Sequence, residues 1–448
     1  MSGAGRPGPR SGGWGTLNDA PDPVATRVEG TRLSSPNVLD DLVWRGLVAH
    51  STDPDELRAA LGAGSVRFYV GFDPTAPSLH MGNLVQLVTA RRLQLAGHTP
   101  YVLVGGATGM IGDPRDSGER TLNSAETVAE WTERVKRQVS AFVSFDGANA
   151  ATVVNNHDWT ASLSVIDFLR DIGKHFPVNR MLARETVRRR LESGISYTEF
   201  SYVLLQSMDF LTLFRQHGVT LQHGGSDQWG NLTGGAELIR RAEGATAHAF
   251  ATPLITKADG TKYGKTEGGA LWLDPEMMSP YAFYQFWLNV EDEKVGELLR
   301  IFTFLSHDEI EALEQQTADK PFLRAGQKAL AQEITTLVHG AEETERIQAA
   351  AAALFGGGDL HGLPVATLEA ALAETGGGSV PAGEPLPTVV DLLVLAGLAT
   401  SRGDARRTVA EGGAYLNNER VTDPEAVPTQ ADLLGGVWLV MRRGKKRF

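Results

Sequence analysis

The chain has 448 residues and a net charge of −12 at pH 7; 42% of its residues are hydrophobic and 21% are charged. This composition is typical of a globular protein with two or three domains, and it excludes a fibrous or wholly disordered chain. The acidic balance also argues against a protein that coats nucleic acid non-specifically.

Cysteine is absent, which excludes disulfides, thiolate nucleophiles and cysteine zinc sites and predicts a cytoplasmic location. No apolar run is long enough for a membrane span, and the N-terminus lacks the apolar core of a secretory signal. Residues 1–35 hold seven glycines and four prolines with little periodicity, and they predict a disordered tail.

Alternating strand and helix patterns begin after this tail. Residues 38–47 predict a short helix, 66–72 a strand, 83–96 a helix closed by Gly97, and 101–104 a second strand. Such a unit forms a right-handed parallel crossover. The pattern continues with strands predicted at 151–155, 220–222 and 248–255 and helices at 165–172, 199–216 and 234–241. The sequence therefore predicts a doubly wound, Rossmann-like α/β domain.

The C-terminal part has a different character. Residues 279–354 read as helices, and glycine and proline clusters over 355–387 predict hinges around a short helix. The last unit, 386–448, has helices and a strand predicted at 437–441. It carries nine Lys and Arg against seven Asp and Glu, a net charge of +2, so the rest of the chain has a net charge of −14. This asymmetry favours either a small α+β RNA-binding module or a solubilising basic tail.

Two loops carry residues suited to phosphates. His80, Gly82 and Asn83 stand where a strand end meets a helix N-terminus, which offers unpaired N–H groups to an anion. Lys262 and Lys265, separated by Gly264, suit a loop that closes over phosphates. Taken alone, such a histidine is more often a helix cap or a satisfied core residue, and such lysines are more often solvated on an exposed hairpin.

A polar stripe runs along the predicted helix 199–216. Tyr202, Gln206 and Asp209 are spaced four and then three residues apart, so they share one face of an otherwise apolar helix. The stripe fits either a solvent face or a site for a small polar ligand. We favour the ligand, because a solvent stripe usually contains Lys or Glu. Glycine-rich stretches at 105–113 and 222–231 follow strand ends and fit either close backbone approach to a ligand or simple tight turns.

Together these segments resemble the bacterial tyrosyl-tRNA synthetases, which are class I aminoacyl-tRNA synthetases. Residues 80–83 are similar to the class I "HIGH" signature, with Asn83 in place of its second His, and residues 262–266 are similar to the "KMSKS" loop. Residues 71–76, 105–114, 202–209 and 224–231 narrow the resemblance to the tyrosine enzymes. The resemblance covers the chain from about residue 39 to residue 448.

The resemblance implies roles for individual residues. The phenolic hydroxyl of tyrosine would be bound by Tyr69 and Asp209, and the rest of the amino acid by Asp73, Asp113, Tyr202, Gln206 and Gln228. ATP would be bound by Gly71, His80, Gly82, Asn83, Gly225, Asp227, Leu254 and Lys265. The residues that stabilise the leaving pyrophosphate would be Thr75, His80, Lys262, Lys265 and Thr266. Arg120 is an uncertain match to a basic residue near pyrophosphate.

The implied reaction consumes ATP with Mg²⁺ and L-tyrosine, forms tyrosyl-adenylate, and transfers the tyrosyl group to tRNA(Tyr). No protein metal site, prosthetic group or membrane contact is expected. Residues 386–448 look like the small RNA-binding module of this family, and tRNA contacts are expected from Arg402, Arg406, Arg407, Lys445 and Lys446. The nearest alternatives are a tryptophanyl-tRNA synthetase and a non-catalytic RNA-binding protein on the same scaffold.

The same resemblance implies how the chain is divided into domains. Residues 36–270 would form the Rossmann-like catalytic domain, with an insertion at about 115–200 that makes a homodimer. Residues 271–355 would form an α-helical tRNA-binding domain, 356–385 a linker, and 386–448 the RNA-binding module.

Overall fold

A computed structural model describes residues 37–114, 122–256, 265–266, 269–356, 358–363, 365–372, 377–381 and 383–444. The predicted tail at 1–35 lies outside these ranges. None of the helices within them combines the length and the apolar character that a membrane span needs.

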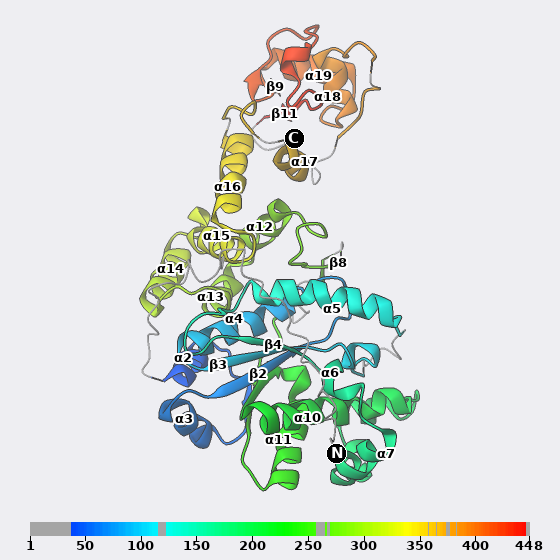
Figure 1. Cartoon of the computed structure of the whole chain (residues 1–448). Coiled ribbons are helices and arrows are strands. Elements are labelled where there is room, and N and C mark those ends of the chain that lie inside the picture. The colour runs from blue at the N-terminus through cyan, green and yellow to red at the C-terminus, as the bar shows by residue number, and fades with distance from the viewer. Residues whose placement is uncertain are drawn as a thin grey trace, which may run out of the picture.

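A six-stranded sheet lies at the centre of the N-terminal half (Figure 1). Its order is β1-β6-β5-β2-β3-β4, and every pair is parallel except β1 with β6. The strands are β1 (His50–Ser51), β2 (Arg67–Phe72), β3 (Thr99–Val104), β4 (Thr152–Asn155), β5 (Leu221–Gly225) and β6 (His248–Thr252). The doubly wound prediction is confirmed. The short edge strand β1 was not predicted, and β6 ends before Pro253, inside the predicted span.

Side-chain alternation on β2 divides the core into two parts. Phe68, Val70 and Phe72 pack with α4 (Met81–Leu95) in the larger hydrophobic cluster, whereas Tyr69 packs with α10 (Tyr197–His217) in the second cluster. Successive strand residues point to opposite faces. The alternation therefore aims Tyr69 at the face of the sheet that α10 covers.

Further helices complete the α/β part. They are α2 (Val38–Trp44), α3 (Pro54–Ala63), α5 (Ala125–Ser140), α6 (His157–Thr160), α7 (Val165–Asp167), α8 (Val178–Leu182), α9 (Glu185–Arg190) and α11 (Trp229–Glu243). Figure 1 shows α4 and α5 on one side of the sheet and α10 and α11 on the other. The helix predicted at 165–172 is only partly α-helical, because Phe168–Ile172 forms a π-helical turn.

Five helices, α12 to α16, follow the sheet and pack on one another. Their bounds are α12 (Pro280–Leu288), α13 (Asp292–Phe302), α14 (His307–Asp319), α15 (Ala325–His339) and α16 (Ala341–Gly356). Figure 1 shows α16 leading from this group toward the C-terminal unit. The prediction that 279–354 is helical is confirmed.

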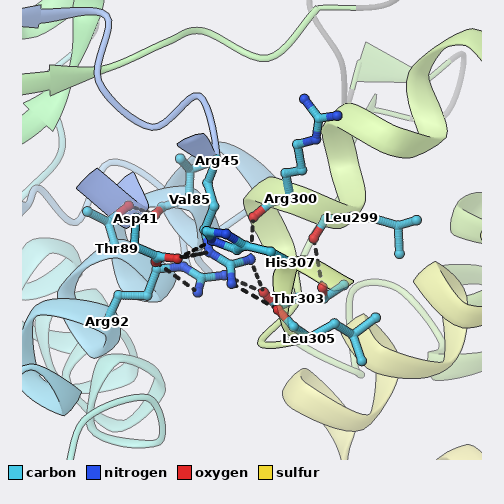
Figure 2. Close-up of polar contacts among 10 residues, drawn as sticks. All are labelled: Asp41, Arg45, Val85, Thr89, Arg92, Leu299, Arg300, Thr303, Leu305 and His307. Atoms are coloured by element: carbon cyan, nitrogen blue, oxygen red, sulfur yellow. Dashed lines mark hydrogen bonds and ion pairs between the residues drawn. The ribbon is translucent and has the colours of Figure 1, made fainter. Parts of the chain in front are cut away.

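A buried ion cluster anchors these helices to the sheet (Figure 2). The fully buried Asp41 on α2 binds Arg45 Nε at 3.0 Å and lies 2.8 Å from His307 Nε2. Arg45 donates from Nη1 to the carbonyl of Arg300 and from Nη2 to that of Leu305. Arg92, on α4, donates to the carbonyl of Thr303 in the same connection. Two buried guanidinium groups therefore hold the connection from α13 to α14 against α2 and α4.

The short helix α17 (Val365–Leu372) packs on α12 and α16. The C-terminal unit that follows combines α18 (Val389–Leu395) and α19 (Arg402–Ala410) with a small sheet of β9 (Ala414–Leu416), β10 (Glu419–Arg420) and β11 (Met441–Arg443), in the order β10-β9-β11. The strand predicted at 437–441 is wrong in position, because the observed strand β11 begins at Met441. Gly435 and Gly436 have positive φ, a bridge between Leu434 and Trp438 closes a turn, and pairing with β9 starts only at Met441.

Candidate active site

One end of the candidate site lies between β2, α6 and α10. Asp209 is 2% exposed, and its two carboxylate oxygens accept hydrogen bonds from Trp159 Nε1 at 2.8 Å and Asn156 Nδ2 at 3.0 Å. Burial raises the pKa of Asp209 to about 7, although both donors favour its ionised form. The buried Tyr69 hydroxyl has no hydrogen-bond partner among the described residues. Burial and the nearby Asp209 charge raise the Tyr69 pKa well above its usual value.

The polar stripe on α10 is turned inward. Tyr202 is 5% exposed, and its hydroxyl donates to Asp73 Oδ2 at 2.6 Å. Thr108 donates to the other oxygen of Asp73 at 2.6 Å. Gln206 Oε1 is buried without a partner among the described residues. The stripe is therefore not a solvent face. It presents polar groups to the interior, and leaving one of their atoms, Gln206 Oε1, buried without a partner is costly.

Glycine makes room for the Asp73 carboxylate. A Cβ on Gly105 would lie 2.0 Å from Asp73 Oδ1 and 2.3 Å from Thr108 Oγ1. Any side chain at this position would displace the carboxylate. The glycine-rich stretch after β3 thus serves close approach of a polar group and is more than a turn.

Asp113 forms a second carboxylate centre beside the first. It accepts from Gln228 Nε2 at 2.7 Å and from Asn231 Nδ2 at 3.2 Å. Burial raises its pKa to about 6, while the two amide donors act in the opposite direction. Asp73, Asp113 and the Tyr202 hydroxyl together offer anionic and hydrogen-bonding groups suited to an ammonium group.

The first signature loop pairs through its backbone with the segment that follows the second signature loop. His80 is the N-cap of α4; its Nδ1 accepts from the Gly82 amide at 3.0 Å, and Asn83 Oδ1 accepts from the His80 amide at 3.0 Å. The segment after β7 (Lys265–Thr266) and β8 (Gly269–Ala270) then crosses this loop. Met81 donates to the Leu271 carbonyl at 2.9 Å, and a backbone bridge pairs His80 with Trp272.

The remaining side of the site is open. Thr75, Gly82 and Asp227 are exposed, as is Leu254 at 42%. Gly71 and Gly225 lie at the C-terminal ends of β2 and β5. Ligands of open α/β sheets bind in the crevice at such strand ends.

Comparison with known proteins agrees with this geometry. Residues 62–356 match the model of the class I tRNA synthetases (W and Y), and residues 378–448 match the tyrosine–tRNA ligase SYY-like C-terminal domain. The tyrosine–tRNA ligase of Streptomyces coelicolor is 63% identical over 92% of this chain and 98% of its own length. The chain belongs to the tyrosine–tRNA ligase family.

Other relatives are consistent with this membership. The tyrosine–tRNA ligase of Corynebacterium efficiens is 56% identical over 92% of this chain and 98% of its own. A crystal structure of a C-terminally truncated Coccidioides posadasii mitochondrial tyrosyl-tRNA synthetase has a TM-score of 0.62 and 30% identity. It covers 72% of this chain and 93% of that chain.

Some residues with an expected role in this family cannot be placed. Lys262 and Arg120 lie outside the described residues, as do Lys445 and Lys446. For Lys265 and Thr266 only the backbone is described, where the two residues form β7.

The three expected tRNA-binding arginines are exposed on α19 or at its start. Each lies near an acidic side chain of the same unit. Arg402 pairs with Asp391 at 3.2 Å, Arg406 with Glu425 at 2.8 Å, and Arg407 lies 4.0 Å from Asp404. Exposed pairs of this kind are weak and can be exchanged for phosphate.

Four residues of the site were missed from the sequence: Thr108, Asn156, Trp159 and Asn231. Thr108 and Asn231 lie inside the glycine-rich stretches at 105–113 and 222–231, so their place in those stretches was the available signal. Asn156 and Trp159 directly follow the end of β4, and their position after a strand was the available signal.

Proposed function

We propose that this protein activates L-tyrosine with ATP to form tyrosyl-adenylate and pyrophosphate, and then transfers the tyrosyl group to the 3′-terminal adenosine of tRNA(Tyr). Family membership and the geometry of the site both support this proposal. The observation that carries it is a buried Tyr69 hydroxyl without a hydrogen-bond partner among the described residues, close to the buried Asp209 carboxylate. A phenol can donate to the carboxylate and accept from the Tyr69 hydroxyl.

The first step needs no protein nucleophile. The α-carboxylate of tyrosine attacks the α-phosphorus of ATP in line, and pyrophosphate leaves. Asp73, Asp113 and Tyr202 would hold the ammonium group of the tyrosine, so that its carboxylate is presented toward the loop that begins α4. Catalysis then rests on positioning and on stabilising the charge that develops in the transition state.

Phosphate contacts are proposed for the two signature loops. Thr75 and His80 on one side and Lys262, Lys265 and Thr266 on the other would surround the pyrophosphate, with Mg²⁺ bound to ATP as part of the substrate. The backbone pairing between residues 271–273 and residues 79–81 supports this proposal, since it ties the segment that follows the second loop to the first loop.

The remaining assignments are also proposals: a homodimer, a cytoplasmic location, and tRNA binding by the helical and C-terminal units. Exposed apolar side chains are frequent in the expected dimer-forming insertion, at Leu163, Val165, Ile166, Leu169, Val178, Leu182, Leu191 and Tyr197. Such exposure typically marks an interaction surface. Contacts from arginines to phosphates predict tRNA affinity that falls with added salt.

Amino-acid-dependent exchange between ATP and pyrophosphate tests the proposed function. Purified protein should support exchange with L-tyrosine and not with L-phenylalanine or L-tryptophan. Phenylalanine would leave the Asp209 carboxylate without its phenol partner, and tryptophan has no hydroxyl oxygen to accept from Tyr69. Exchange driven only by tryptophan, or by no amino acid, would contradict the proposal.

A further inference from the structure

Arg184 lies where the expected dimer-forming insertion contacts the amino-acid site. It is the N-cap residue of α9, directly after α8, and its guanidinium packs against α11. Its Nη1 donates to Asn231 Oδ1 at 3.3 Å. Asn231 belongs to α11 and is 9% exposed.

The surface of α11 accommodates this guanidinium because side chains are missing there. Gly230 and Gly234 are four residues apart and share one helix face. A Cβ on Gly234 would lie 2.9 Å from Arg184 Nη2, and one on Gly230 would lie 3.6 Å from Nη1. Glycine inside a helix is unfavourable relative to alanine, so two glycines on this face suggest a packing requirement. The Arg184 guanidinium fills the space that they leave.

The contact determines which way the Asn231 amide faces. With its oxygen held by Arg184, the amide nitrogen points to Asp113 Oδ1 at 3.2 Å and to Gln228 Oε1 at 2.9 Å. A reversed amide would set its oxygen against two other oxygens and its NH₂ group against a cation. The orientation of an amide follows from such a network, and here the cation leaves one acceptable choice.

We propose that Arg184 is a positioning residue for the tyrosine site, acting through the Asn231 amide to hold Asp113 and Gln228 in place for the substrate ammonium group. This inference rests on the proposed function of the site. Burial lowers the pKa of Arg184 to about 10, and the Asp113 charge acts against that shift. The guanidinium therefore stays charged at neutral pH, as the amide orientation requires.

The other arginines nearby do not share this environment. Arg180 on α8 is exposed, and its nearest acid is Glu237 at 3.9 Å. Arg189 on α9 is exposed as well and binds Glu185 within its own helix. Arg180 is therefore a matched control, because its loss removes the same charge from the same segment without touching the amide network.

The test compares Arg184→Met, Arg184→Lys and Arg180→Met in tyrosine-dependent ATP–pyrophosphate exchange without tRNA. Arg184→Met should raise the KM for tyrosine roughly tenfold, the loss expected for one hydrogen bond to a charged group. The KM for ATP should change less than about twofold, because Asn231, Asp113 and Gln228 face the amino acid. Arg184→Lys should recover most of the loss, and Arg180→Met should behave as the unchanged protein.

A double-mutant cycle with Asn231→Ala keeps the inference testable if Arg184→Met folds poorly. If Arg184 acts through Asn231, then Arg184→Gln, which loses the charge but keeps a polar side chain, should add little to the loss that Asn231→Ala already causes. Independent, additive losses would overturn the inference. So would an unchanged KM for tyrosine in Arg184→Met, including the case in which only tRNA charging falls. Failure of the unchanged protein to show tyrosine-dependent exchange would instead refute the proposed function.

Discussion

In the proposed function, Asp209 is the residue on which substrate selection depends most. Its carboxylate is buried, and its ionised form is favoured by the donors Asn156 and Trp159, which lie about 50 residues away in the sequence. A carboxylate with a pKa of about 7 is only partly ionised at neutral pH. Small changes in its surroundings should therefore alter the strength of phenol binding.

Trp159→Phe should weaken tyrosine use in a pH-dependent way. Loss of the indole N–H removes a donor that favours the ionised carboxylate, so the pKa of Asp209 rises further above about 7. At pH 7 we expect kcat/KM for tyrosine to fall roughly tenfold. The deficit should shrink as the pH rises, since ionisation recovers, and a pH profile of the exchange reaction measures this. Trp438→Phe, which removes an indole donor to Glu369 in the C-terminal unit, should leave the profile unchanged.

Asp209→Asn should lower activity with tyrosine and raise the free energy of unfolding. The folded protein holds Asp209 at a pKa of about 7 against an ordinary value of 3.8, so it binds more protons than the unfolded chain between these pH values. The unfolding free energy of the unchanged protein therefore falls as the pH rises through this window. Asn does not ionise, so the stability of the variant relative to the unchanged protein should grow from pH 4 to 7 and then level off. Thermal unfolding across this range measures the trend, and a constant difference would contradict the assigned burial.

At the scale of whole elements, α4 joins two parts of the molecule. Its N-terminus carries His80, Gly82 and Asn83, and its last turn carries Arg92, which holds the connection from α13 to α14 (Figure 2). The Asp41 carboxylate is the shared counter-charge of the two buried guanidinium groups there, 3.0 Å from Arg45 Nε and 3.9 Å from Arg92 Nη1. Removing one member of such a cluster leaves an uncompensated buried charge.

Asp41→Asn should therefore destabilise the protein strongly. We expect the unfolding free energy to fall by about 3–5 kcal/mol, because Arg45 and Arg92 would remain buried without their counter-charge. Asp40→Asn is a matched control one residue away. Asp40 pairs with Arg58 at the surface, so its loss should change stability by less than about 1 kcal/mol. Urea denaturation of the two variants tests the difference, and equal effects would refute the role of the cluster.

Local sequence patterns predicted most elements but not their long-range partners. The sheet strands and α10 follow from apolar periodicity and from turn residues, which act over a few positions. The Asp41 cluster joins residues up to 266 apart in sequence, and no local pattern reports such pairing. The strand predicted at 437–441 is wrong because most of that apolar run does not pair with another strand. Trp438 instead closes a turn with Leu434, and pairing with β9 starts at Met441. The candidate site was largely predictable, since its motifs lie at strand ends, whereas Asn156 and Trp159 belong to no motif.

For the whole molecule, we propose that two copies associate through the segment between β4 and α10. Ile166 and Val178 are 69% and 61% exposed there, which is unusual for large apolar side chains of a monomer. The same segment carries Arg184, so association and the tyrosine site share one structural element.

Ile166→Glu should shift the protein from dimer to monomer. A charge in an apolar interface costs several kcal/mol of association free energy when it is left unpaired. Sedimentation velocity at micromolar concentration should show a dimer for the unchanged protein and a substantial monomer fraction for the variant. A matched change at Val437, which is 68% exposed in the C-terminal unit, should leave the dimer intact. A monomeric unchanged protein would contradict the proposal.

The central claim is that Tyr69 and Asp209 recognise the phenol of the substrate. A crystal structure with bound L-tyrosine tests it most directly. We predict the phenolic oxygen within hydrogen-bonding distance of both the Tyr69 hydroxyl and the Asp209 carboxylate, with the ammonium group near Asp73, Asp113 and Tyr202. A tyrosine ring bound elsewhere, or bound with its hydroxyl away from Asp209, would contradict the claim.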